Sequence, residues 1–598
     1  MKRIFSIIIA ISLILSCFCG GFINASAETA NETQYIDNSD LLPEYKDDDE
    51  VELEDSGDGL YSPDWVKTLI ICEWNVRNAT SEGTFDAAIS LLDHYAETGV
   101  NGIWLTPIYD DNDDSNYGNY GVHTISKAMT GCDNYEDGFA KFKNFVDEAH
   151  SRNIRIFLDV VTWGCDTEAP LYNEHPEWFK GYSYWGGWDY DFSNEEFYEY
   201  FVTNLVKWTT DYGVDGFRCD CEPSYTGYTM FKDVRERALA AGEKICIFSE
   251  NTNERMNGCY DFDEHSAGND QWNIWELFTE KYDLIDAVKN GTGLSTNYYQ
   301  LTGEAGKARF YSYNMSCHDQ DYGMDGNMAI TAYQAMFTPF IPIFMMGEEF
   351  DNDSDYITTF STPLNLDLLN EERHRQYFEE FKLMIRLRRT YADIFEEFPT
   401  HLYDTKIEEV EVVGLETIQG YVRYNDKYAF IVVANNNIHT SGPFTVRVPF
   451  AEIGYEDAEY SVTDLITGEI VATGNYKTLY DFQADVAQDK AGLYLLQKIG
   501  SLDGEKHEYV SYSELVVDKN GKAVTESVSD TAVVETVSTD SVTNVDSEEE
   551  DVSLDDSDNS PETGEAVTLY TIISALLAFA FAVGVFSYTK KMKFGRRS

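Results

Sequence analysis

Residues 65–398 repeat one pattern, in which a short apolar run typical of a buried strand alternates with a segment whose apolar residues fall at helical spacing. The strand-like runs are residues 69–74, 102–106, 154–160, 214–220, 244–250, 308–314 and 342–346. The helical stripes are clearest at Phe85, Ala88, Ile89 and Leu92, at Phe139, Phe142, Phe145, Val146 and Ala149, and at Phe197, Phe201, Leu205 and Trp208. Strands buried on both faces that alternate with amphipathic helices indicate a parallel sheet.

This repeat predicts an α/β fold, and the number of units favours a closed (β/α)8 TIM barrel over residues 61–398. An open, doubly wound sheet is the structural alternative. After residue 399 the helical spacing ends, and strand-like segments 421–424 and 428–434 flank the turn Asn425-Asp426, which predicts a hairpin. With further strand patterns downstream, residues 399–500 are predicted to form a C-terminal antiparallel β-sandwich.

One segment interrupts the repeat after the third strand. Residues 163–190 are too many for an ordinary strand-to-helix loop. The segment is rich in aromatic residues, namely Trp178, Tyr182, Tyr184, Trp185, Trp188 and Tyr190. Aromatic faces can pack on the apolar faces of sugar rings, so this excursion is a candidate glycan-binding element; a local aromatic core is the alternative, and both interpretations can hold.

The N-terminal region carries an export pattern. A basic start at Lys2 and Arg3, an apolar run over residues 4–15 and the small residues Ala25-Ser26-Ala27 predict a signal peptide over residues 1–27. An uncleaved membrane anchor is the alternative. Residues 28–60 are acidic and rich in Asn and Asp, so we expect a disordered lead.

The C-terminal region carries an anchoring pattern. Residues 501–559 are rich in Ser, Thr and acidic residues and are predicted to form a disordered stalk. Within residues 560–598, Ser560-Pro561-Glu562-Thr563-Gly564 precedes an apolar run over 566–588, long enough for a transmembrane helix, and a basic tail. This order resembles a sortase sorting signal of Gram-positive bacteria, with Ser560 in place of the usual Leu.

The sorting-signal resemblance implies cleavage between Thr563 and Gly564 by sortase and attachment of the chain to cell-wall peptidoglycan. The departure at Ser560 bears on the class of sortase rather than on the anchoring. A plain transmembrane anchor is the alternative, and in both cases the catalytic part is expected to be extracellular.

The formal net charge of −63 argues against a nucleic acid partner, because phosphate groups are repelled by such a surface. It suits an exported protein that acts on a neutral substrate, and we expect a monomer. The chain has 10 cysteines, two of which, Cys17 and Cys19, lie in the signal peptide. The rest show no Cys-x-x-Cys pair, so we expect mostly buried thiols, no assignable disulfide and no structural zinc.

Acidic residues stand at or near the ends of four strand-like runs, at Asp159, Asp220, Glu250 and Asp319. Since the carboxyl ends of barrel strands face one cleft, we expect these carboxylates to converge. Asp220 and Glu250 end successive strands, and two carboxylates about 5 Å apart can serve as nucleophile and acid/base in retaining glycoside hydrolysis. Arg218, two residues before Asp220, projects to the same side and would keep Asp220 ionised.

From about residue 65 to residue 500 the chain resembles the α-amylase family of glycoside hydrolases, family 13. The resemblance rests on Gly216-Phe217-Arg218-Cys219-Asp220, Phe248-Ser249-Glu250-Asn251 and Ser316-Cys317-His318-Asp319. It implies Asp220 as nucleophile, Glu250 as acid/base and Asp319 as transition-state stabiliser. Arg218 and His318 match the invariant Arg and His of the family. Tyr120 roughly matches the Tyr that stacks on the sugar at the cleavage point, and Tyr117 is the alternative.

One departure from the family concerns the residues after Asp159. The family usually has Asn and His four and five residues further on, where this chain has Trp163 and Gly164. That Asn is normally a calcium ligand and that His a sugar contact, so their absence puts a structural calcium in doubt; no cofactor is expected to be required. Asp159 and Trp163 are retained as candidate substrate contacts.

These features together predict a secreted, wall-anchored retaining hydrolase of α-glucosidic bonds, mainly α-1,4 links in starch-like glucans or maltooligosaccharides. A transglycosylase that uses the same residues is one alternative. A non-catalytic glycan-binding surface protein is another, although binding alone would not need the complete set of acids, Arg218 and His318.

Overall fold

The computed structural model describes residues 35–45, 54–55, 61–111, 117–220, 227–250, 262–263, 284–290, 310, 312–318, 327–352, 364–399, 402–413, 418–436, 440–455 and 458–501. The predicted signal peptide, stalk and sorting signal lie outside the described residues, and so does Asp319. A search of the described helices for one both long and apolar enough to cross a bilayer finds none.

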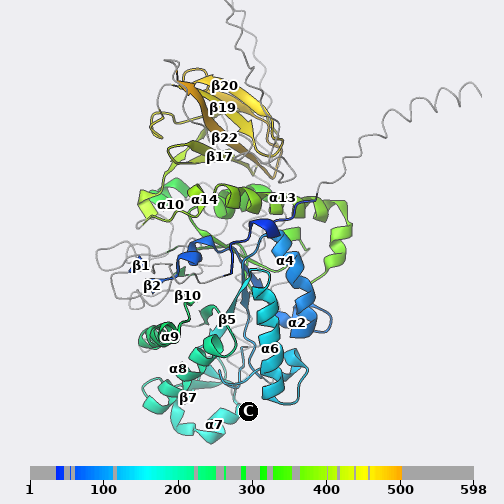
Figure 1. Ribbon diagram of the computed structural model, residues 1–598, viewed down its shortest axis with the longest axis vertical. Helices are drawn as coiled ribbons and strands as arrows, with labels where there is room; N and C mark the ends of the chain where they lie inside the picture. The colour runs from blue at the N-terminus through cyan, green and yellow to red at the C-terminus, as the bar shows by residue number, and fades with distance from the viewer. Residues whose placement is uncertain are drawn as a thin grey trace, which may run out of the picture. The chain divides into compact units, whose positions relative to one another are not determined.

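Eight parallel strands form the central sheet (Figure 1). In chain order they are β3 (Ile71–Trp74), β4 (Gly102–Leu105), β5 (Arg155–Val161), β9 (Gly216–Asp220), β10 (Cys246–Ser249), β11 (Phe262–Asp263), β12 (Ser312–Asn314) and β13 (Ile341–Met345). Their spatial order is β11-β10-β9-β5-β4-β3-β13-β12. The first strand of this sheet in chain order, β3, therefore pairs with the last, β13. Ile71 lies opposite Ile343 in that pairing. The sheet therefore curls back on itself, and the fold is the predicted TIM barrel rather than an open sheet.

Seven of the strands fall where the apolar runs predict them, and β11 is the one that the sequence pattern missed. It has only two residues, too few to stand out as an apolar run. The predicted helices are α6 (Tyr135–His150), α8 (Glu195–Thr210) and, around residues 85–92, the succession of α3 (Phe85–Ala88), a 3₁₀ turn and α4 (Leu92–Thr98). Asn134 and Asn194 cap the first two by accepting hydrogen bonds from backbone N–H groups of the first turn.

Two apolar layers hold the barrel. Its interior is filled by Val66, Leu69, Ile71, Trp104, Phe157, Cys246, Phe248, Phe310, Ile341 and Ile343. A second, larger cluster lies between the sheet and the surrounding helices and includes Phe142, Phe145, Phe201 and Trp208. Because side chains fill the interior, chemistry in this fold belongs at the rim, where the carboxyl ends of the strands meet.

The predicted excursion follows β5. It contains β6 (Gly164–Cys165), α7 (Pro170–Glu174), β7 (Phe179–Tyr182) and β8 (Trp188–Tyr190), and its three strands form an antiparallel sheet in the order β6-β8-β7. The excursion thus starts directly at the carboxyl end of the third barrel strand.

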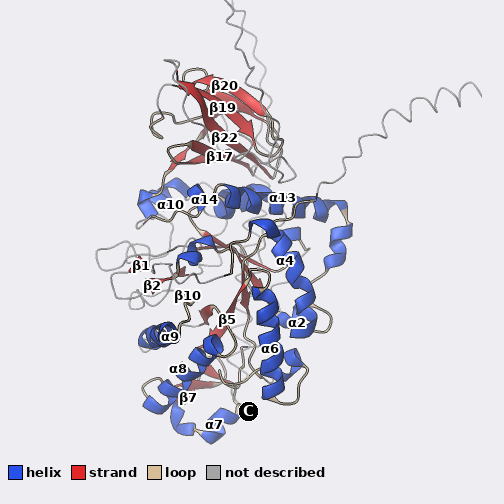
Figure 2. Cartoon of the chain, in the orientation of Figure 1, coloured by secondary structure: helices blue, strands red, loops and turns tan. Residues whose placement is uncertain are grey.

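The C-terminal region forms two antiparallel sheets, seen as red strands in Figure 2. The larger consists of β14 (Ile407–Glu409), β16 (Ile418–Tyr424), β17 (Tyr428–Asn435), β22 (Lys490–Ser501), β19 (Ala458–Asp464) and β20 (Ile470–Asn475). The smaller consists of β15 (Glu411–Val412), β18 (Phe444–Arg447) and β21 (Asp481–Ala484). Asn425 turns the predicted hairpin, since its Oδ1 accepts hydrogen bonds from the backbone of Lys427 and Tyr428.

Part of the predicted disordered lead is ordered. Ile36 is 1% exposed, and Asn38 Nδ2 donates to the backbone oxygens of Thr98 and Lys382 at 2.9 and 2.8 Å. Tyr45 stacks on the His150 ring at a centroid distance of 3.8 Å. The expectation of disorder therefore does not hold for residues 35–45, because Ile36 and Leu42, spaced among the acids, bury their apolar side chains.

Candidate active site

Polar side chains gather at the carboxyl ends of the barrel strands. They are Glu73 in β3, Asp159 in β5, Arg218 and Asp220 in β9, Glu250 directly after β10 and His318 after β12. All but Glu250 are at least nine-tenths buried. Five strands far apart in sequence thus bring ionisable groups to one rim.

Arg218 lies at the centre of the acids. Its Nη1 is 3.0 Å from Asp220 Oδ1 and 3.1 Å from Asp159 Oδ2. Its Nη2 is 3.9 Å from Glu250 Oε2. The positions follow from strand geometry, since Arg218 and Asp220 are two residues apart on one strand and Asp159 pairs with Arg218 across the ladder. Asp220 and Glu250 are therefore held by one guanidinium.

The carboxylates outnumber the positive charge that Arg218 supplies. Burial raises the pKa of Asp220 to about 6, although the attraction of Arg218 opposes the rise. Burial raises the pKa of Asp159 to about 8, against the attraction of Arg218 and with a contribution from the Asp220 charge. The sequence-based expectation that Arg218 alone would keep Asp220 ionised is thus met only above about pH 6.

Tyr117 links Asp159 to His318. Its hydroxyl donates to Asp159 Oδ2 at 2.9 Å and lies 2.8 Å from His318 Nε2, while its ring stacks on the imidazole. The Tyr117 hydroxyl has one hydrogen but two hydrogen-bond partners. A second proton, carried by Asp159 or by His318 Nε2, is therefore needed for both contacts to be hydrogen bonds. The structure therefore brings Tyr117, the alternative from the sequence, to the acids.

Tyr120 has different neighbours. Burial raises its pKa first, and then the charges of Asp166, Glu168 and Asp110 do so, which places those acids around it. Its backbone N–H donates to the backbone carbonyl oxygen of Asp110 at 2.7 Å. Tyr120 thus lies near Asp110 and the start of the excursion, among different acids from those around Arg218.

Glu73 is the site residue that the sequence reasoning did not single out. Its side chain is fully buried, its Oε1 is 2.6 Å from His318 Nδ1, and its Oε2 accepts the backbone N–H of His318 at 3.3 Å. Two contacts from one carboxylate fix both the ring and the backbone of His318. The available signal was a lone acid inside the otherwise apolar run Ile70-Ile71-Cys72-Glu73-Trp74.

Trp163 stands beside the cleft without joining the acids. Its neighbour Thr162 donates to the backbone oxygen of Asp220 at 2.6 Å. A Cβ on Gly187 would clash with the Cys165 backbone oxygen and lie 2.9 Å from the tip of the Trp163 ring, so only glycine fits between them. Trp163 therefore connects the rim of the barrel to the excursion.

The described residues contain no group of three or more His, Cys, Asp or Glu side chains that could hold a metal ion. The thiols of Cys72 and Cys165 are free and buried, as expected for most cysteines, and that of Cys132 is half-buried. Burial raises the pKa of the Cys72 thiol well above its ordinary value.

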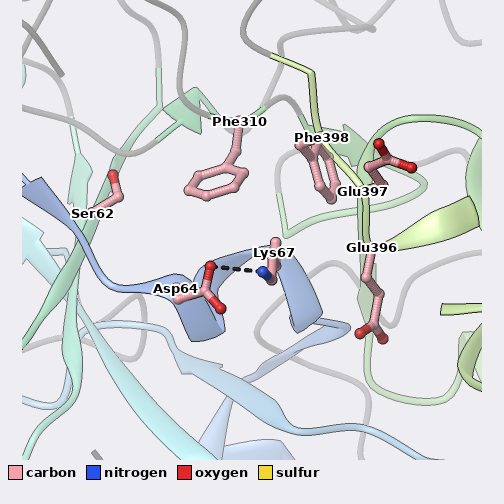
Figure 3. Close-up of a pocket in the computed structure, with 7 residues that line it drawn as sticks. All are labelled: Ser62, Asp64, Lys67, Phe310, Glu396, Glu397 and Phe398. Carbon is pink, nitrogen blue, oxygen red and sulfur yellow. Dashed lines mark hydrogen bonds and ion pairs between the residues drawn. The ribbon is translucent and has the colours of Figure 1, made fainter. Parts of the chain in front are cut away.

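A cavity of about 180 Å³ lies elsewhere, at the amino ends of the strands (Figure 3). Its lining residues are Ser62, Asp64, Lys67, Phe310, Glu396, Glu397 and Phe398. Three of its charged residues are already paired, Lys67 with Asp64 at 2.6 Å and Glu396 with Arg389 at 2.9 Å. It contains no predicted site residue, and Lys67 and Phe310 precede β3 and β12, so this cavity is separate from the acids.

Comparison with known proteins matches residues 57–185 to the family model described as "Alpha amylase, catalytic domain". A malto-oligosyltrehalose trehalohydrolase of Saccharolobus solfataricus is 24% identical over 52% of this chain and 62% of its own length. Alpha-amylase 3 of Dictyoglomus thermophilum is 29% identical over 27% of this chain and 38% of its own length. The chain thus spans less than two thirds of these relatives.

Among solved structures, a maltogenic α-amylase of Thermotoga neapolitana superposes with a TM-score of 0.55 at 20% identity, over 72% of this chain and 99% of its own. A cyclomaltodextrinase superposes with a TM-score of 0.55 at 17% identity, over 74% of this chain and 80% of its own. At such identities the superpositions establish a shared fold. Together with the family match, the relatives support an α-amylase-family catalytic domain and indicate a glycoside hydrolase.

Proposed function

We propose that this chain is a retaining glycoside hydrolase that cleaves α-glucosidic bonds, mainly α-1,4 links in starch-like glucans or maltooligosaccharides. The observation that carries the proposal is the contact of one buried guanidinium, Arg218, with both Asp220 and Glu250. Both carboxylates lie within 3.9 Å of this guanidinium, which supports the separation of about 5 Å that retaining hydrolysis requires. The names of the relatives, which include α-amylase and α-glucosidase, support an α-glucan as substrate.

In this proposal Asp220 attacks the anomeric carbon and forms the covalent glycosyl intermediate. Glu250 donates a proton to the leaving oxygen and then removes one from the attacking water. Arg218 fixes the direction of the Asp220 oxygens through the 3.0 Å contact. Its charge also favours the ionised nucleophile over the protonated one.

We assign His318, Asp159 and Tyr117, which are joined by the contacts of the Tyr117 hydroxyl, to binding of the sugar at the cleavage point. Because Nδ1–H of His318 is held by Glu73, Nε2 can donate to a sugar hydroxyl when the imidazole is protonated and accept from one when it is neutral, once substrate takes the place of the Tyr117 hydroxyl. Asp319 directly follows His318 in the chain and is assigned the role of third acid, which stabilises the positive charge on the sugar ring in the transition state.

Export and cell-wall anchoring are part of the proposal. They rest on residues 1–27 and 560–598, whose sequence patterns fit a signal peptide and a sortase substrate. Such an enzyme would act outside the cell while attached through Thr563 to peptidoglycan.

The Glu250→Gln variant tests the catalytic assignment. The variant keeps the size of the side chain but has no proton to donate, so turnover of amylose and maltooligosaccharides should fall by about three orders of magnitude or more, while amylose binding persists. Proton NMR of the first products should show the α-anomer for a retaining enzyme, and an absence of lengthened products separates hydrolysis from transglycosylation. Glu236→Gln, an exposed change on α9 (Gly227–Ala241), serves as the matched control. Unchanged turnover in the Glu250 variant would refute the assignment.

A further inference from the structure

The structure divides the aromatic residues of the excursion into two sets. Trp178 and Tyr190 are 7% and 3% exposed and belong to the core that includes Phe197 and Phe201. Tyr182, Tyr184 and Trp185 are instead 65%, 93% and 62% exposed. Trp178 and Tyr190 thus contribute to an aromatic core, while Tyr182, Tyr184 and Trp185 form a separate aromatic surface on the β7–β8 hairpin.

The hairpin that carries this surface is held in one shape. Ser183 is 3% exposed; its N–H donates to the Gly187 oxygen at 2.8 Å, and its hydroxyl accepts from the Trp185 N–H at 3.2 Å. Below the tip, Tyr172 stacks on Trp188 with ring centroids 3.9 Å apart. A surface whose backbone is already fixed loses little conformational entropy when a ligand binds to it.

The charge around these rings selects the kind of ligand. The segment 181–187 has no charged side chain, in a chain that carries a formal net charge of −63. Anionic ligands such as phosphates or acidic lipids are repelled by the protein as a whole. A neutral ligand with flat apolar faces and hydroxyl groups is not repelled, and it can stack on Tyr and Trp while the Tyr hydroxyls hydrogen-bond to it.

The hairpin is also physically connected to the catalytic rim. Gly187, in the loop between β7 and β8, lies against the Cys165 backbone and the Trp163 ring, and Thr162, the residue before Trp163, donates to the Asp220 backbone oxygen. The loop that carries the exposed rings is therefore joined through Trp163 to the residues beside Asp220.

We propose that Tyr182, Tyr184 and Trp185 form an accessory binding surface for the α-glucan chain, outside the site where the bond is cleaved. The inference rests on the proposed function for the identity of the glucan. Its role is to retain long chains, so it should matter for amylose and not for a substrate that fills only the cleft.

The test uses the full chain with Glu250→Gln, so that no substrate is consumed, and adds Tyr184→Ala with Trp185→Ala. Retardation in native gels cast with amylose should weaken by about fivefold or more in apparent dissociation constant, the loss typical of removed aromatic anchors. Tyr480→Ala, an exposed tyrosine of the β domain at 47%, is the matched control and should leave retardation unchanged. Replacement of both residues by Phe, which keeps the stacking faces, should restore most of the binding.

In the active enzyme, the same double alanine variant should lower the ratio of kcat/KM on amylose to kcat/KM on maltotriose by a similar factor. Unchanged retardation by amylose, in a variant whose melting temperature matches the parent, overturns the inference. So does a change of sedimentation coefficient without loss of glucan binding, which would assign the rings to a second copy of the chain. If amylose is bound through the hairpin but never hydrolysed by the parent enzyme, the proposed function fails and the accessory surface stands.

Discussion

Two groups of ionisable side chains, each centred on buried Arg and Asp residues, lie near the two ends of strands β5 and β9, and the groups differ in how their charges are balanced. The amino-end group consists of Arg155, Asp215 and His150, and the carboxyl-end group consists of Arg218, Asp159, Asp220 and Glu250. At the amino end two basic side chains share one acid. At the carboxyl end one basic side chain serves three.

This difference sets the pKa values in opposite directions. Burial opposes ionisation of Asp215, but His150 at 2.8 Å, Arg155 at 3.2 Å and the Ile156 N–H at 2.7 Å together hold the pKa of Asp215 below its ordinary value. At the carboxyl end burial prevails, and the pKa of Asp220 rises to about 6. Residues of the same types thus form a satisfied structural ion pair at one end and a reactive site at the other.

The largest expected effect is a loss of activity at the carboxyl-end group, and the same Asp-to-Asn substitution made in each group should tell the two groups apart. Asp220→Asn should lower kcat/KM about 10⁴-fold or more, because the nucleophile is lost. It should leave the melting temperature unchanged or raise it, since an excess buried negative charge is removed. Steady-state kinetics on maltooligosaccharides and thermal melts measure both quantities.

Asp215→Asn is the matched control, with the same chemical change near the other end of the same strand. Breaking a buried ion pair costs about 3 kcal/mol of unfolding free energy, so its melting temperature should fall while the folded fraction keeps most of its activity. If Asp215→Asn removed activity and Asp220→Asn removed stability, the distinction between the two groups would be wrong.

A second, smaller effect concerns Glu73. Glu73→Gln replaces the charged partner of His318 Nδ1, and a hydrogen bond to a charged group contributes about 1.5–3 kcal/mol. If that energy positions His318 in the transition state, kcat/KM should fall about 10- to 100-fold, mostly in kcat, with a shift of its pH profile.

Glu349→Gln tests whether that loss is specific. Glu349 is also buried and pairs with His94 at 2.9 Å, but that histidine lies on helix α4 and not at the end of a barrel strand. The variant should lose stability with little change in the pH profile. Equal pH profiles for the two variants would reduce Glu73 to a structural role.

The smallest effect is the pH dependence. Asp220 must be ionised to act as nucleophile, so kcat/KM should fall up to tenfold per pH unit below about pH 6. Stability behaves differently. The raised pKa of Asp220 means that the folded state binds this proton more readily than the unfolded state, so between pH 6 and the ordinary value of 3.8 this group favours folding as pH falls.

Asp215 adds to this separation of activity from stability. Its lowered pKa stabilises the fold above the ordinary value of 3.8, and that contribution is lost only below it. Activity should therefore decline near pH 5 while circular dichroism still reports a folded protein. A kcat/KM that stays flat to pH 4.5 would contradict the assignment of Asp220.

The sequence by itself determined the order of strands and helices, because burial on both faces of a strand and on one face of a helix leaves a period in the chain. It also determined Asp220, Glu250, Arg218 and His318 as residues at strand ends, because strand ends are local features. The excursion and the β domain could be predicted for the same reason, since each breaks the period.

Only the tertiary structure decided between barrel and open sheet, because the pairing of β3 with β13 joins residues that are 272 positions apart, as with Ile71 and Ile343. It also chose Tyr117 over Tyr120 and added Glu73, because each is defined by a partner, His318, from a distant strand. The charges around a buried side chain come from every strand that ends near it. Those strands are far apart in the sequence, so no local stretch of sequence shows which charges will meet.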